Sequence, residues 1–154
     1  MKLAIVGTGY VGLVSGACFA EFGYQTVCID NNISRIESLK SGKCPFFEPG
    51  MDNLLSKHLK ITKLLCFSSS LSESIKDSDI VFITVGTPSR RLDDQADLSH
   101  VWSVSKEIAK NINKYSLVVT KSTVPVGTSK EIKKIIGSII SDDLFDVVSN
   151  PEFL

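Results

Sequence analysis

The order of residue types at the start of the chain most constrains what this sequence can fold into. A short, mostly apolar run at 2–6 leads directly into the sequence GTGYVG at 7–12. Small and apolar residues then recur at helical spacing as far as Ala20, and a second apolar run at 25–29 ends at Asp30. This order predicts a strand, a glycine-rich turn, a helix, a second strand and an acidic residue within one βαβ unit.

Each glycine of this turn has its own physical task. Gly7 permits a sharp turn with positive φ, Gly9 allows a pyrophosphate to approach the backbone, and Gly12 lets the helix pack closely on the sheet. The free N–H groups and the dipole of the helix N-terminus then favour phosphate. Asp30 is placed to bind the adenine-ribose hydroxyls and to repel a 2′-phosphate, so we expect NAD rather than NADP. A purely structural glycine turn is the alternative.

Length and charge limit the class of protein. The 154 residues suffice for one domain with its own core, and Lys plus Arg equals Asp plus Glu at 17 each. Net charge therefore favours neither nucleic acid nor a membrane surface as a partner. No apolar run approaches the roughly 20 residues of a membrane span, and no signal-peptide pattern precedes the first strand. We expect a cytoplasmic protein.

The cysteines do not suggest a metal site or a disulfide framework. Cys18, Cys28, Cys44 and Cys66 form no CxxC pair, and the two histidines supply no zinc spacing. Cys18, Cys28 and Cys66 lie in apolar patterns, so we expect them to be buried and inert. Cys44 lies in a loop, where a catalytic role is the less favoured alternative.

The rest of the chain repeats the alternation of strand and helix. Further strands are predicted at 64–67, 80–85, 117–120 and 146–149. Helices are predicted at 34–41 with Ser34 as N-cap, and at 51–59, 70–76, 98–111 and 128–140, the last capped by Thr128 or Ser129. The pattern predicts an α/β fold: a single Rossmann-type domain over 1–154 with a doubly wound, parallel, six-stranded sheet in the order 3-2-1-4-5-6.

The predicted topology gathers several residues at one edge. Gly9, Asp30, Thr87, Thr123 and Glu152 all follow the carboxyl ends of predicted strands. In an open α/β sheet ligands bind at this edge. The sequence therefore predicts one shared site.

Several segments resemble the UDP-glucose/GDP-mannose dehydrogenase family. They are GTGYVGLVSG at 7–16, EPG at 48–50, VGTP at 85–88, KSTVPVGT at 121–128 and SNPEFL at 149–154. The KSTVPV segment resembles the UDP-glucose 6-dehydrogenase branch more than the GDP-mannose branch. The resemblance implies oxidation of the C6 alcohol of UDP-glucose to UDP-glucuronate, through an aldehyde and a cysteine thioester, with two NAD molecules reduced.

The resemblance also implies roles for individual residues. Gly7, Gly9, Tyr10, Val11 and Gly12 belong to the cofactor site, with Val11 and the glycines along the pyrophosphate. Asp30 holds the adenine ribose, with Arg35 near it. Thr87 and Thr123 line the cofactor and the reaction centre, and Glu152 is the acid/base carboxylate.

Each of these roles has a simpler alternative. Arg35 could be a solvated helix charge, Thr87 could only end a strand, and Thr123 could bond only its own turn. Glu152 could belong to a frayed terminus, and Lys121 could be structural rather than catalytic.

The resemblance further implies a second half of the active site. Family members continue into a dimerising helix and a second domain with the nucleophilic cysteine and most of the UDP site. Residues 89–95 also depart from the family pattern, so the sequence does not predict whether this loop closes over the cofactor. We therefore expect the NAD-binding domain of a UDP-glucose 6-dehydrogenase, inactive alone, as a homodimer or together with a C-terminal half. The alternatives are a non-catalytic NAD-binding module and a domain acting on GDP-mannose or a UDP-N-acetyl sugar.

Overall fold

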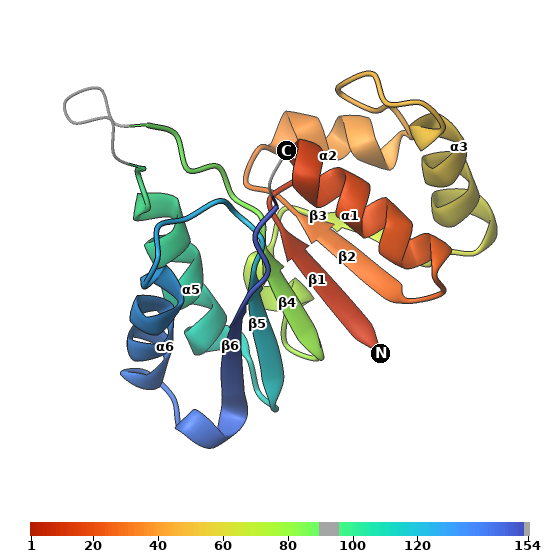
Figure 1. Ribbon diagram of the computed structural model, residues 1–154. Coiled ribbons are helices and arrows are strands. Elements are labelled where there is room, and N and C mark those ends of the chain that lie inside the picture. Colours follow the sequence, from red (N-terminus) through yellow and green to blue (C-terminus); the bar gives the residue numbers. More distant parts are fainter. Residues whose placement is uncertain (90–95, 153–154) are drawn as a thin grey trace.

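Six parallel strands form the sheet of this protein in a computed structural model that describes residues 1–89 and 96–152 (Figure 1). Their order across the sheet is β3-β2-β1-β4-β5-β6, so the predicted doubly wound order is confirmed. In chain order the strands are β1 (Lys2–Val6), β2 (Gln25–Ile29), β3 (Leu65–Ser68), β4 (Ile80–Ile83), β5 (Ser116–Thr120) and β6 (Phe145–Ser149).

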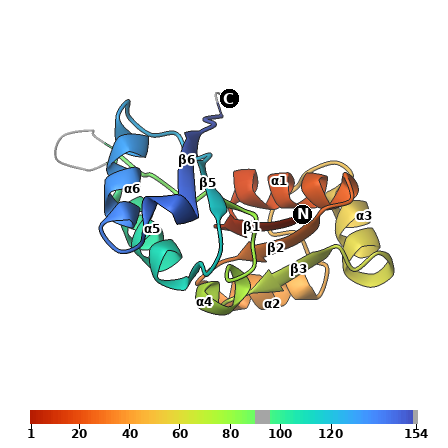
Figure 2. The same cartoon turned by 90° about the horizontal axis from the view of Figure 1, so that it is seen from below.

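Helices cover the sheet on two sides, which gives three layers (Figures 1 and 2). One apolar core joins the sheet to the first three α-helices, and a second joins the opposite face to the last two. No helix in the described part of the chain is long and apolar enough to cross a membrane. The helical segments are α1 (Tyr10–Glu21), α2 (Ile33–Lys40), α3 (Met51–Ser56), η1 (Lys57–Ile61), α4 (Leu71–Ser74), α5 (Ser99–Asn111), α6 (Thr128–Gly137) and η2 (Asp142–Leu144).

Strand β1 shows why the apolar runs are nearly continuous. Leu3 and Ile5 point into the core beneath α1, whereas Ala4 and Val6 point into the opposite core with α5 and α6. All four side chains are buried. A parallel strand covered on both faces needs apolar residues at every position, which an alternating pattern would not supply.

Two predicted helix starts are wrong in detail. Asn32, not Ser34, caps α2, because the Asn32 side chain accepts hydrogen bonds from the Arg35 N–H at 3.0 Å and the Ser34 hydroxyl at 2.9 Å. Helix α6 has Gly127 at its cap position with φ of 95° and no side-chain cap. It also ends at Gly137, three residues before the predicted end at Ile140.

The helix predicted at 51–59 changes its geometry part-way. Helix α3 passes into the π-helical turn η1, in which His58 is 1% exposed. The His58 ring contacts the Glu21 carboxylate through Nε2 at 2.7 Å and the Thr62 hydroxyl through Nδ1 at 2.9 Å. His58 therefore links η1 to the end of α1, a contact that apolar periodicity gives no means of predicting.

The cysteines differ from the predicted burial at two positions, Cys18 and Cys66. Cys28 is fully buried in the sheet, and burial raises the pKa of its thiol, as expected of an inert cysteine. Cys18 is only partly buried. Cys66 is exposed, so its predicted burial is wrong. It lies in β3, which is an edge strand and has a neighbouring strand on one side only.

Candidate functional site

The glycine turn brings the ends of β1, α1 and β4 into direct contact. Gly7 has φ of 109°, and a Cβ there would lie 2.7 Å from the Thr84 carbonyl oxygen. A Cβ on Gly12 would collide with the Gly7 carbonyl oxygen and would lie 2.6 Å from the Thr84 hydroxyl. Two of the three motif glycines therefore permit close backbone packing, as the sequence predicts.

Gly9 differs from the other two glycines because no atom of the described residues lies within 4 Å of the place a Cβ would take. Gly9 is the N-cap residue of α1, and no side chain in the described part of the chain caps this helix. The first N–H groups of a helix have no intrahelical acceptor and carry the positive end of the dipole. Open space therefore lies beside a helix end that is electrostatically suited to a phosphate.

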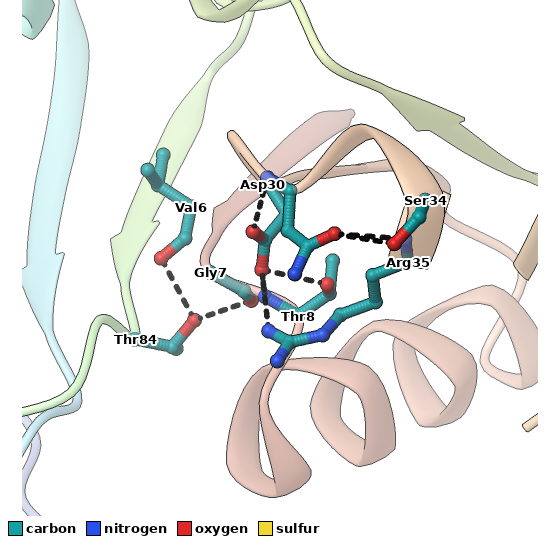
Figure 3. A network of polar contacts seen from close by, with 8 residues as sticks. Val6, Gly7, Thr8, Asp30, Ser34, Arg35 and Thr84 are labelled. Atoms are coloured by element: carbon teal, nitrogen blue, oxygen red, sulfur yellow. Dashed lines mark hydrogen bonds and ion pairs between the residues drawn. The ribbon is translucent and has the colours of Figure 1, made fainter. Parts of the chain in front are cut away.

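Asp30 is held in place at the end of β2 (Figure 3). Its Oδ2 accepts hydrogen bonds from the Thr8 N–H at 2.9 Å and the Thr8 hydroxyl at 2.8 Å, and Arg35 Nη1 lies 3.1 Å away. Its Oδ1 accepts from the Asn32 N–H at 2.9 Å. Arg35 is thus an ion-pair partner of Asp30 and not merely a solvated helix charge.

These contacts keep Asp30 ionised. Burial alone would raise the pKa of this carboxyl, but the hydrogen bonds from Asn32 and Thr8 and the charge of Arg35 outweigh burial and lower the pKa. The side chain is only 9% exposed, so a nearly buried negative charge stands at the end of β2.

The first of two adjoining hollows opens beside Asp30 and has a volume of about 450 Å³. Gly7, Gly9, Asp30 and Arg35 line one side, and His100 of α5 lies on its wall. This volume is in the range of small-molecule sites.

The second hollow has a volume of about 480 Å³ and shares Gly9 and Thr84 with the first. It is lined by residues from four strand ends, so the predicted gathering at one edge is observed. Its lining includes Gly9, Tyr10, Val11, Thr87, Lys121, Thr123 and Glu152.

A short chain of contacts orders the far side of the second hollow. The Thr87 hydroxyl donates to the Thr123 carbonyl oxygen at 2.9 Å, and the Thr123 hydroxyl donates to the Glu152 carbonyl oxygen at 3.2 Å. Lys121 Nζ lies 3.3 Å from Glu152 Oε2. Thr123 therefore bonds across to the chain after β6 rather than only within its own turn, and Glu152 is held on two sides.

Sequence reasoning missed two residues that build this region, Thr8 and Thr84, and left the role of Lys121 undecided. Thr8 anchors Asp30, and the Thr84 hydroxyl contacts the carbonyl oxygens of Val6 and Gly7, each at 2.9 Å (Figure 3). Lys121, which the sequence leaves without a role, pairs with Glu152. The sequence does contain a signal for Thr84, because it places a hydroxyl residue directly after the apolar residues of a buried strand. Residues 90–95, where the sequence departs from the family pattern, lie outside the described residues.

Comparison with known proteins identifies the family. The whole chain, residues 1–154, matches the NAD binding domain of the UDP-glucose/GDP-mannose dehydrogenase family. The chain belongs to this family. The resemblance read from the glycine turn and the strand-end motifs is thereby confirmed, as is NAD as the cofactor of the domain.

Similar sequences carry the same family assignment. The chain is 50% identical to a UDP-glucose 6-dehydrogenase of Rhizobium meliloti (strain 1021) over 154 residues, which is all of this chain and 35% of the relative. It is 47% identical to UDP-glucose 6-dehydrogenase TuaD of Bacillus subtilis (strain 168), over 99% of this chain and 33% of the relative. The chain therefore spans about a third of the length of these curated relatives.

Similar solved structures include two members of the family. A UDP-glucose dehydrogenase from Pyrobaculum islandicum superimposes with a TM-score of 0.92 at 36% identity, over 99% of this chain and 36% of that one. A GDP-mannose dehydrogenase from Pseudomonas aeruginosa superimposes with a TM-score of 0.93 at 32% identity, over 100% of this chain and 36% of that one.

The residues present fit a dinucleotide. A Cβ at Gly9 would fill the open space at the start of α1, and the adjoining hollows extend from there toward Asp30 on one side and Glu152 on the other. The buried carboxylate matches ribose hydroxyls, which donate hydrogen bonds, better than it matches an anion.

Proposed function

We propose that one NAD molecule lies across both hollows, with its pyrophosphate beside Gly9. The observation that carries this proposal is the position of Gly9, which lines both hollows at the uncapped start of α1. The adenine ribose then lies in the first hollow beside Asp30 and Arg35, and the nicotinamide lies in the second, among Tyr10, Val11, Thr87 and Thr123.

The charge of Asp30 favours NAD over NADP. Its Oδ1 accepts one hydrogen bond in the structure, from the Asn32 N–H, so it retains capacity for a ribose hydroxyl. A 2′-phosphate at the same place would meet a nearly buried carboxylate. Arg35 offsets only part of this repulsion, because its guanidinium is already paired with Asp30.

We further propose that the chain supplies the cofactor half of a UDP-glucose 6-dehydrogenase. NAD, when bound, accepts the hydrides of this oxidation. Glu152 stands at the second hollow and is suited to moving a proton there, and Lys121 Nζ lies 3.3 Å from its carboxylate and restrains it. Thr123 orients the backbone of Glu152 through its hydroxyl. The 50% and 47% identity to UDP-glucose 6-dehydrogenases supports UDP-glucose as the substrate.

A titration with NAD tests the cofactor site. In Gly9→Ala the new methyl group enters open space at a φ of −67°, which alanine adopts freely, so the fold should persist. The same methyl group would occupy the place of the pyrophosphate, and we expect NAD to bind about tenfold more weakly or worse. Equal NAD affinity in Gly9→Ala and the unaltered chain, measured by calorimetry, would contradict the proposed position of the cofactor.

A complementation assay tests the reaction. We expect UDP-glucose-dependent formation of NADH when this chain is mixed with a separately produced C-terminal half of a UDP-glucose 6-dehydrogenase. Glu152→Gln should lower that rate strongly while leaving NAD affinity within about twofold, because the amide cannot transfer the proton. No NADH formation from UDP-glucose in the mixture, while the chain still binds NAD, would contradict the proposed reaction.

A further inference from the structure

Tyr10 connects the second hollow to a distant segment of the chain. It is the first residue of α1, and it lines the hollow beside Gly9 and Val11. Its hydroxyl donates a hydrogen bond to Glu48 Oε2 at 2.7 Å, and its ring lies against Phe46 with the centroids 5.1 Å apart. Both contacts come from the segment between α2 and α3.

That segment is itself fixed to the core. The Glu48 carbonyl oxygen accepts a hydrogen bond from the Met51 N–H at 3.1 Å, and the Met51 side chain is buried at the start of α3. Phe46 packs against the same core from its edge. Glu48 and Phe46 are therefore anchored to the core, and they can restrain the more exposed Tyr10 side chain that they contact.

The hydrogen bond also determines what Tyr10 offers to the hollow. The acceptor Glu48 raises the pKa of the Tyr10 hydroxyl, with smaller contributions from burial and from the charges of Glu48 and Glu152. The phenol thus stays protonated, and its one O–H is used by Glu48. Toward the hollow Tyr10 presents a ring in a fixed orientation rather than a free donor.

We propose that Glu48 is a positioning residue of the cofactor site, which holds the Tyr10 ring as a wall of the second hollow. This inference rests on the proposed placement of the nicotinamide in that hollow. The ring would pack against the nicotinamide end of the cofactor and would contribute little to the adenosine end, which lies in the first hollow beyond Gly9.

The chain contains a matched control for this contact. The Tyr115 hydroxyl donates to Asp146 Oδ2 at 3.1 Å, and both side chains are exposed. Tyr115 precedes β5 and so lies at the amino ends of the strands, away from both hollows. The chemistry is the same as in the Tyr10–Glu48 pair, without a hollow beside it.

The test compares two ligands across a set of variants. NAD and ADP-ribose share the adenosine and pyrophosphate, but ADP-ribose lacks the nicotinamide. We expect Glu48→Ala and Tyr10→Phe to weaken NAD binding about three- to fivefold, as the loss of one solvent-exposed hydrogen bond of modest net strength would. Both variants should leave ADP-ribose affinity within about twofold. Glu48→Gln should restore most of the NAD affinity, because its side-chain carbonyl can accept from Tyr10.

Three results would overturn the inference. The first is that Glu48→Ala weakens NAD binding no more than the control Tyr115→Phe does. The second is that Glu48→Ala weakens the binding of NAD and of ADP-ribose equally. The third is that Glu48→Gln binds NAD as weakly as Glu48→Ala. Failure of the unaltered chain to bind either ligand would overturn the proposed function, and the inference with it. Thermal unfolding of each variant confirms that the fold is retained.

Discussion

At the scale of single residues, the three motif glycines are not equivalent. Gly12 is enclosed by the Gly7 backbone and the Thr84 hydroxyl, whereas Gly9 faces open space. The sequence motif assigns a glycine to each position but does not show which one the fold requires and which one the ligand requires. The structure separates the two.

We predict opposite effects for two alanine substitutions. Gly12→Ala should destabilise the domain by about 3 kcal/mol or more, because its methyl group collides with backbone that cannot move without separating β1 from α1. Gly9→Ala should change the free energy of unfolding by less than about 0.5 kcal/mol. Urea unfolding of both variants measures the difference, and equal destabilisation would contradict the packing described.

We predict a pH dependence that belongs to Asp30. Its pKa is lowered in the folded state, so its charge stabilises the fold above the unfolded-state value of about 4, and this contribution disappears as the pH falls through the lower folded value. The difference in unfolding free energy between the unaltered chain and Asp30→Asn should therefore be constant from pH 7 to about pH 5 and shrink below about pH 4. Urea unfolding at pH 7, 5 and 3.5 tests this, and a difference that grows on acidification would contradict it.

At the scale of elements, Thr84 connects the end of β4 to the glycine turn. Its N–H and its hydroxyl both contact the Val6 carbonyl oxygen, and the hydroxyl also lies 2.9 Å from the Gly7 carbonyl oxygen. The residue is 8% exposed, so these contacts are largely shielded from water. They fix the place where β1 passes into the turn.

We predict that Thr84→Val costs about 1–2 kcal/mol of stability, because it leaves the Gly7 carbonyl oxygen without this donor while keeping the side-chain shape. NAD affinity should fall as well, since the turn before α1 is then less restrained. Thr84→Ser should recover most of both losses because it retains the hydroxyl. A stability of Thr84→Val equal to that of the unaltered chain would show that the hydroxyl contributes nothing.

The elements show what a single sequence can and cannot predict. The strands and their order follow from apolar runs that must be buried on both faces, and β4 was found in this way. Helix starts depend on which of several adjacent polar residues forms the N-cap, so the sequence predicts Ser34 at a helix start that Asn32 caps in the structure. The π-helical turn around His58 depends on a partner, Glu21, that lies 37 residues away.

At the scale of the whole molecule, the parallel topology assembles the site. Residues 9, 30, 87, 123 and 152 are distant in sequence but meet along one sheet edge, because every strand ends there. This gathering was predictable from strand order alone. The contacts Lys121–Glu152 and Tyr10–Glu48 were not, because they depend on side-chain directions in loops.

Thermal unfolding of the chain with NAD, with NADP and with neither tests the central claim most directly. At a ligand concentration of about 100 times the dissociation constant, binding adds roughly 2.7 kcal/mol to the free energy of unfolding. For a domain of this size the melting temperature then rises by about 5–10 °C. We predict such a rise with NAD and a much smaller one with NADP at the same concentration, because of the Asp30 carboxylate. An equal rise with NADP would contradict the role of Asp30, and no rise with either would contradict the cofactor site.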